Sequence, residues 1–124
     1  MTVGYRSKEK PDLRVLFCFG VSQSFFDEEQ SSLQAILERL TEAFIDLQGR
    51  FGVEILATFD DDQLMVGPSV AFPWTAYAIA TAPDYDSVVR VCDLLREQAI
   101  GDYRLWRYLR VEARIGRALF FIDQ

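Results

Sequence analysis

The side chains best suited to chemistry in this chain alternate along one short stretch near its C-terminal end. Every second residue there is aromatic or charged: Trp106, Tyr108, Arg110, Glu112 and Arg114. Alternate residues of a β-strand share one face, so these five side chains are expected to line one cavity. Aromatic rings can stack on a ligand ring, and guanidinium groups can hold a carboxylate through two hydrogen bonds. The pattern predicts a site for an aromatic carboxylic acid, although an ion ladder between Glu112 and its arginine neighbours explains the same residues.

Trp74 and Tyr77 are two further candidates for this ligand-binding site. Tyr77 is expected either as a pocket hydroxyl or as a core ring whose hydroxyl makes one hydrogen bond. The segment 67–74 is long for a hairpin loop and ends in a tryptophan, so it either covers the cavity or reaches across a dimer interface. We favour the interface, because tryptophan is enriched at interface centres.

Other chemistry is largely excluded by composition. The chain has no histidine, which removes histidine-based triads and most zinc and haem sites. Its scattered glycines form no phosphate-binding loop. Asp60, Asp61 and Asp62 suit Ca²⁺ or Mg²⁺ by type, but consecutive side chains point in alternating directions, so we expect a solvated turn. A partly buried Asp60 or Asp62 acting as a base is a weaker hypothesis. We expect no metal and no cofactor, and we assign no catalytic residue.

The overall composition describes one domain. The chain has 124 residues, half of them hydrophobic, and a net charge of −6 that argues against nucleic acid as a partner. Cys18 and Cys92 lie in apolar runs and are expected to be reduced core residues. Neither a signal peptide nor a run of about 20 apolar residues is present, so we expect a cytoplasmic protein with no membrane partner.

Hydrophobic periodicity predicts the elements that position these residues. Residues 1–12 are expected to form a flexible arm, and 13–124 a single domain. Residues 13–20 are apolar on both faces apart from Arg14, as in a central strand. Apolar side chains at helical spacing predict one long helix that starts at Ser24 and ends at a glycine cap, Gly49.

The second half of the chain repeats this alternation of elements. Period-two patterns predict strands at 52–59 and 74–82, and alanines on one face of the latter indicate a closely packed helix. A second helix is expected to open at 83–87 and to end before Gly101. Residues 103–121 fit both a helix with a basic stripe and a strand. We favour a helical turn at 102–106 followed by a strand at 108–115.

This order, strand-helix-strand-strand-helix-strand, predicts an α+β fold of the ferredoxin-like βαββαβ type. Both helices would cover one face of an antiparallel sheet. Aromatic side chains on the other face would be left in water, which a second sheet would prevent. We therefore expect a homodimer.

The element order and the uncovered aromatic face resemble the dimeric α/β-barrel superfamily, in which two ferredoxin-like protomers pack sheet to sheet around cavities. The stretches FDDDQLMVGPS (59–69), PWT (73–75), LWRY (105–108) and VEARIGR (111–117) resemble the IacB proteins encoded in bacterial indole-3-acetate degradation clusters. This resemblance spans most of the chain beyond residue 13. It implies an accessory role in the catabolism of an indole or another aromatic acid, and it brings no catalytic residues.

Two classes of function remain. The first is a small protein, with or without enzyme activity, that binds an aromatic, indole-like carboxylic acid. The alternative is a non-catalytic subunit or scaffold that binds a pathway enzyme. We favour the first, because a pure interface rarely needs a cavity lined by both aromatic and charged groups.

Overall fold

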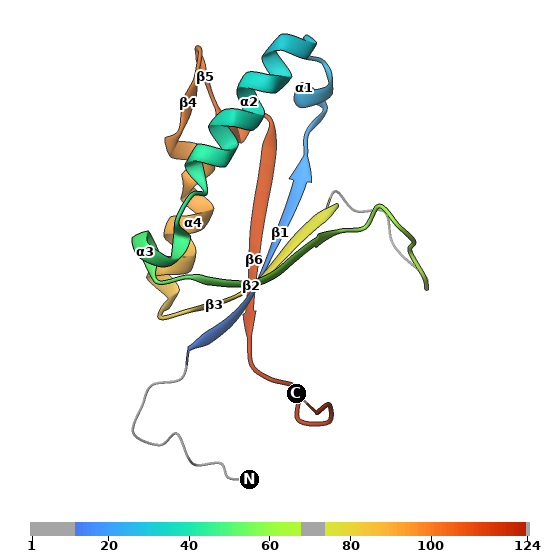
Figure 1. Cartoon of the computed structure of the whole chain (residues 1–124), viewed down its shortest axis with the longest axis vertical. Helices are drawn as coiled ribbons and strands as arrows, with labels where there is room; N and C mark the ends of the chain where they lie inside the picture. Colours follow the sequence, from blue (N-terminus) through green and yellow to red (C-terminus); the bar gives the residue numbers. More distant parts are fainter. Residues whose placement is uncertain (1–11, 68–73, 124) are drawn as a thin grey trace.

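The computed structural model describes residues 12–67 and 74–123. Four strands form one antiparallel sheet in the order β2-β3-β1-β6, as Figure 1 shows. Their bounds are Leu13–Val21 for β1, Glu54–Asp60 for β2, Ala76–Ala82 for β3 and Leu109–Gly116 for β6. The architecture is α+β and is compatible with a ferredoxin-like fold. The predicted arm, except for Asp12, and residues 68–73 of the 67–74 segment lie outside the described residues.

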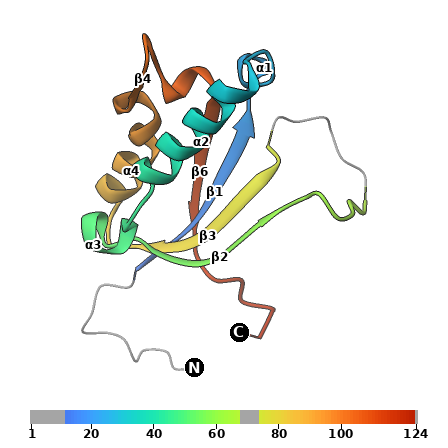
Figure 2. The same cartoon turned by 45° about the horizontal axis from the view of Figure 1, so that its top comes forward.

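Helices α2, α3 (Leu47–Phe51) and α4 lie on one side of the sheet, and α1 (Gln23–Phe26) lies at the end of β1 (Figures 1 and 2). The longest are α2, Gln30–Ala43, and α4, Tyr85–Glu97. Ala78, Ala80 and Ala82 of β3 are buried in the same core as Val88 and Val91 of α4. Short alanine side chains allow a helix to approach a strand closely. The prediction that a helix packs on an alanine face is therefore confirmed.

The single long helix predicted from Ser24 to Gly49 is wrong, because the structure divides this segment into three. The helices are α1 (Gln23–Phe26), α2 and α3 (Leu47–Phe51). Asp46 separates the last two in a left-handed conformation, and its carboxylate accepts a hydrogen bond from the Gly49 N–H. Gly49 lies inside α3, and Gly52, with φ of 74°, ends it. The apolar spacing continues across the break, so periodicity alone does not reveal it.

The second predicted helix begins where expected. The Asp84 carboxylate accepts hydrogen bonds from the N–H of Ser87, at 2.8 Å, and from its hydroxyl, at 2.9 Å. Gly101 does not end this helix. It forms the turn, with φ of 57°, between two short paired strands, β4 (Ala99–Ile100) and β5 (Tyr103–Arg104).

The ambiguous C-terminal segment is a helical turn followed by a strand, as favoured from the sequence. The turn is a 3₁₀ helix, η2, at Leu105–Arg107, and β6 follows from Leu109. Leu109 and Tyr108 join a second core cluster with Ile36, Leu95 and Leu105, which packs between α2, α4 and the end of β6. Within the described ranges, none of the helices has the length and apolar character that a membrane span requires.

The Asp84 cap gives a test of this helix. We expect Asp84→Ala to lower the free energy of unfolding by about 1 kcal/mol, because the first turn of α4 loses its side-chain acceptor. Asp84→Asn retains an acceptor oxygen and should keep most of that stability. Urea denaturation of the two variants makes the measurement, and equal losses in both would contradict the cap.

Candidate functional site

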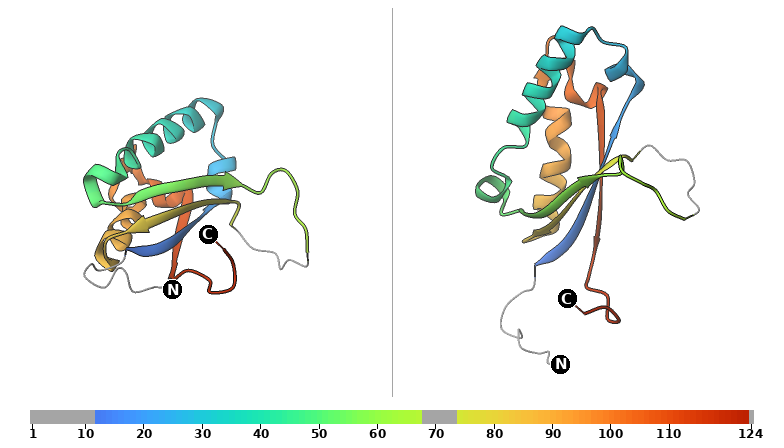
Figure 3. Two further views of the ribbon diagram at one scale, coloured as in Figure 1. Left: turned by 60° about the horizontal axis from the view of Figure 1, so that its bottom comes forward. Right: turned by 45° about the vertical axis from the view of Figure 1, so that its right-hand side comes forward.

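No described helix or strand covers the face of the sheet that is turned away from α2 and α4 (Figure 3). We call it the uncovered face. Phe59, Tyr77, Cys18 and Glu112 lie in one row across its four strands, because Phe59 pairs with Tyr77, Tyr77 with Cys18, and Cys18 with Glu112. Their strand neighbours Phe17 and Ala78 are buried in the core, so this row points to the other face. The next row contains Ile79, Leu16 and Arg114.

An aromatic pair lies at the β2 side of this face. The rings of Phe59 and Tyr77 are 5.1 Å apart at 32°, and Phe59 is 53% exposed. The Tyr77 hydroxyl lies 3.4 Å from the Asp61 carboxylate and 3.2 Å from the Trp74 carbonyl. Burial, and next the negative charge of Asp61, raise the pKa of Tyr77 above its usual value. Tyr77 is therefore a protonated hydroxyl at the edge of an aromatic surface.

An ion pair lies at the β6 side. The Arg114 guanidinium donates to the Glu112 carboxylate at 2.7 Å, and both side chains are partly exposed. This is the pairing expected of an ion ladder, the alternative to a ligand site. A ligand carboxylate would have to share Arg114 with Glu112. Since the pair is partly solvated, such an exchange costs little.

Cys18 lies between the aromatic pair and the ion pair. It is a free thiol, fully buried by its neighbours on the uncovered face. Burial raises its pKa, while the Arg114 charge acts in the opposite direction. A protonated thiol here makes the middle of the face apolar. Cys18 and Phe59 were missed as site residues, although the alternation of Leu16 and Cys18 with Phe17 could have indicated Cys18.

The alternation predicted that five side chains share one face: Trp106, Tyr108, Arg110, Glu112 and Arg114. This prediction is wrong for the two aromatic residues. Tyr108 is buried on the helix side, and Trp106 packs against the same core cluster. The reason is η2 and the helical backbone of Tyr108, which interrupt the alternation before β6 begins. Arg110 shares the strand face with Glu112 and Arg114, but its guanidinium lies 4.5 Å from the Trp106 ring centroid. The ring centroid of Trp106 is also 4.5 Å from the guanidinium of Arg96, so two arginine side chains already contact this ring.

Tyr108 instead lines a separate hollow of about 350 Å³ between α2 and the β4–β5 turn. Glu28 and Asp102 also line it. Burial, and then the charge of Glu28, raise the pKa of Tyr108. The hollow has carboxylates where an acid ligand needs cations, so it does not suit the predicted ligand.

Asp60, the last residue of β2, forms a turn with Asp61 and Asp62. The Asp62 N–H donates to the Asp60 carboxylate at 3.2 Å, and Asp60 and Asp62 are exposed. Among residues 12–67 and 74–123, no group of three or more histidine, cysteine, aspartate or glutamate side chains could hold a metal ion. Asp61 is the member of the run with a contact to the uncovered face, through Tyr77.

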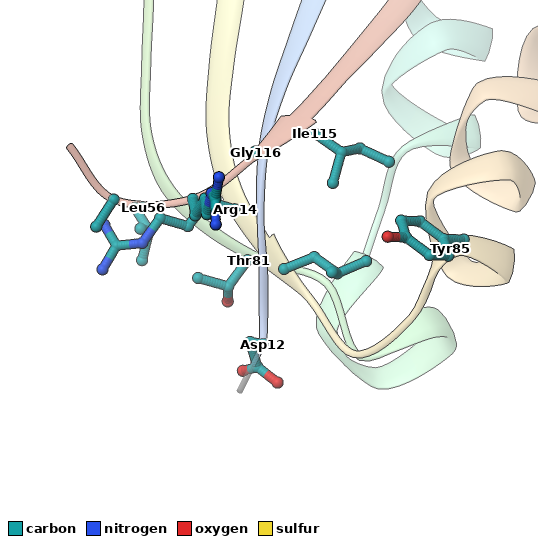
Figure 4. A pocket seen from close by; sticks show the side chains of 10 residues that line it. Asp12, Arg14, Leu56, Thr81, Tyr85, Ile115 and Gly116 are labelled. Carbon is teal, nitrogen blue, oxygen red and sulfur yellow. The ribbon is translucent and has the colours of Figure 1, made fainter. Parts of the chain in front are cut away.

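A hollow of about 690 Å³ lies at the end of the sheet where β1 begins and β6 ends. Figure 4 shows Arg14 and Leu56 on one side of β1, with Ile115 and Tyr85 on the other. The hollow therefore extends around the end of the sheet. Its lining residues come from separate segments of the chain, so no local motif indicates it.

Comparison of this chain with protein-family models, with curated proteins and with solved structures gives no match. The functional argument therefore depends on the geometry of the site and on the chemistry of its side chains.

Cys92 on α4 gives a test of the electrostatics outside this face. Burial, and then the Asp93 charge, raise the pKa of its thiol from 9.0 to about 11. The unfolded thiol loses its proton near pH 9 and the folded thiol only near 11, so stability should fall across this window. We expect Cys92→Ala to reduce this fall by less than about 1 kcal/mol, because the thiol is partly exposed. Urea denaturation at pH 8 and pH 10 measures the effect, and identical falls in both proteins would contradict it.

Proposed function

We propose that this protein binds a small aromatic, indole-like carboxylic acid on the uncovered face of its sheet, within a homodimer. The observation that carries the proposal is the set of side chains in two adjacent rows across that face. An aromatic pair lies at one side and a buried thiol in the middle, and Arg114 lies at the other side in the row next to Glu112. An aromatic ring fits the apolar part, and a carboxylate fits Arg114.

The fold supports the same proposal. The strand order β2-β3-β1-β6, with the longest helices on one side, is compatible with a ferredoxin-like βαββαβ domain. In a dimeric α/β barrel, two such sheets would face each other and enclose the uncovered faces. The sequence resemblance to this superfamily and to the IacB proteins favours the same arrangement and a role in aromatic-acid catabolism.

The chemistry of the face favours an aromatic acid over a wholly apolar ligand. Phe59 and Tyr77 supply ring surface, and their tilted contact leaves Phe59 partly exposed. Arg114 supplies a planar pair of donors that suits a carboxylate. Enclosure by a second sheet would remove water and strengthen this charge interaction.

A scaffold that binds a pathway enzyme is the second candidate. It is favoured by the connection after β2, in which Leu64, Met65 and Val66 are all exposed. Consecutive exposed apolar residues are typical of a surface that contacts another protein.

The ligand proposal predicts a thermal shift that is selective for acids. Indole and benzenoid carboxylic acids should raise the melting temperature by several degrees, since a ligand at 100 times its Kd adds ~2.7 kcal/mol. Their neutral amides should have much smaller effects. Arg114→Gln should abolish the preference for acids because the carboxylate loses its donor.

Arg90→Gln is the matched control, because Arg90 is an exposed arginine of α4, which packs on the opposite face of the sheet. It should leave the preference unchanged. A flat response of the unmodified protein across the panel would overturn the ligand proposal and favour the scaffold.

The dimer makes a separate prediction. Ile79 is 41% exposed on the uncovered face, and a carboxylate there would be desolvated by a facing sheet. We expect Ile79→Glu to convert the dimer to a monomer in light scattering. Val89→Glu places the same charge at an exposed position of α4 and should leave the dimer intact. A monomeric unmodified protein at micromolar concentration would contradict the dimer itself.

A further inference from the structure

The C-terminal segment, residues 117–123, is apolar yet lies outside the core. Phe120 is 97% exposed, Phe121 67% and Ile122 53%. The two phenylalanine rings contact each other, with centroids 5.3 Å apart. Adjacent exposed aromatic rings are costly in water, so this segment needs a partner surface.

The position of the segment limits what that surface can be. It follows β6 directly and continues past the end of the sheet, away from the helices (Figures 1 and 2). Arg117, Ala118, Leu119 and Ile122 of this segment line a small hollow of about 260 Å³ together with Arg14, a residue of β1. No ring contact joins Phe120 or Phe121 to the described aromatic residues of the uncovered face, Phe59 and Tyr77.

One chain thus carries two apolar surfaces, the sheet face and the C-terminal segment. Large apolar side chains of both remain exposed to solvent within the single chain. In a two-fold dimer, any contact between residue i of one copy and residue j of the other occurs twice. A second copy can therefore cover both surfaces at once. We propose that residues 117–123 of each copy pack over the uncovered sheet face of its partner and form one wall of the ligand site. This inference rests on the proposed dimer and its site.

The area available supports a second copy as the occupant. A standard interface buries about 800 Å² per partner, a little over half of it apolar. At about 200 Å² per large side chain, the half-exposed Leu56, Phe59 and Ile79 offer roughly 300 Å². Phe120, Phe121 and Ile122 add roughly 400 Å². The sheet face alone falls short of a stable interface, and the C-terminal segment supplies the difference.

The contact would also complete the site. The Phe59–Tyr77 pair offers a ligand ring one surface, and the partner's Phe120 or Phe121 would offer the second. Two surfaces hold a ring by stacking from both sides and exclude water from the Arg114 guanidinium. Ligand affinity would then depend on the C-terminal segment of the opposite chain.

A dimer assembled from isotope-labelled and unlabelled copies of the unmodified protein tests the proposal. Isotope-filtered NMR detects only contacts between copies. We expect nuclear Overhauser effects between the Ile79 methyl groups of one copy and the Phe120 or Phe121 rings of the other. Inter-copy signals confined to the two sheets would overturn the proposed wall and leave the dimer standing, whereas a monomer in light scattering of the same sample would remove both.

Substitutions provide a second readout. Phe120→Ser with Phe121→Ser removes four buried rings from the dimer, because each contact occurs twice. At about a tenfold change per ring, the dimer dissociation constant should rise roughly ten-thousandfold. Phe26→Ser removes a ring of similar exposure from α1 and should leave the dissociation constant unchanged. An unchanged dissociation constant in the double variant would overturn the contact.

Discussion

The contact between three alanines of β3 and the helix α4 determines how the molecule is arranged. Ala78, Ala80 and Ala82 leave room for the apolar stripe of α4 to reach the sheet, and together they form the main core. The second core cluster extends this layer under α2. Because the apolar stripes of both long helices are used on this side, none of the described helices remains to cover the opposite face.

The uncovered face has a composition that plain solvation does not explain. It combines a fully buried thiol, an aromatic pair and an ion pair within two adjacent rows of the four-stranded sheet. Each polar group already has a partner: Tyr77 contacts Asp61, and Arg114 contacts Glu112. Since both contacts are partly solvated, the face can exchange them for a ligand or for a facing sheet at small cost. This adaptability is what a binding surface needs.

Local periodicity was sufficient for most of the elements but failed where the backbone changes conformation. It predicted the four strands of the sheet and the helical turn before β6. It missed the break at Asp46, because the apolar spacing continues through it. In the structure, Arg50 donates hydrogen bonds to the carbonyls of Ala43 and Ile45, next to the break. It also placed Trp106 and Tyr108 on the site face, because the two-residue alternation continues through the turn, whereas the backbone remains helical as far as Tyr108.

By itself, the sequence determined the α+β class, the single apolar face of each long helix and the absence of histidine chemistry, since these depend on residue type and on spacing within one element. Only the tertiary structure decided which side chains meet. Phe59, Tyr77, Cys18 and Glu112 are far apart in the chain, and the antiparallel register joins them in one row. Pairing register depends on contacts between strands distant in sequence, so no local pattern contains it.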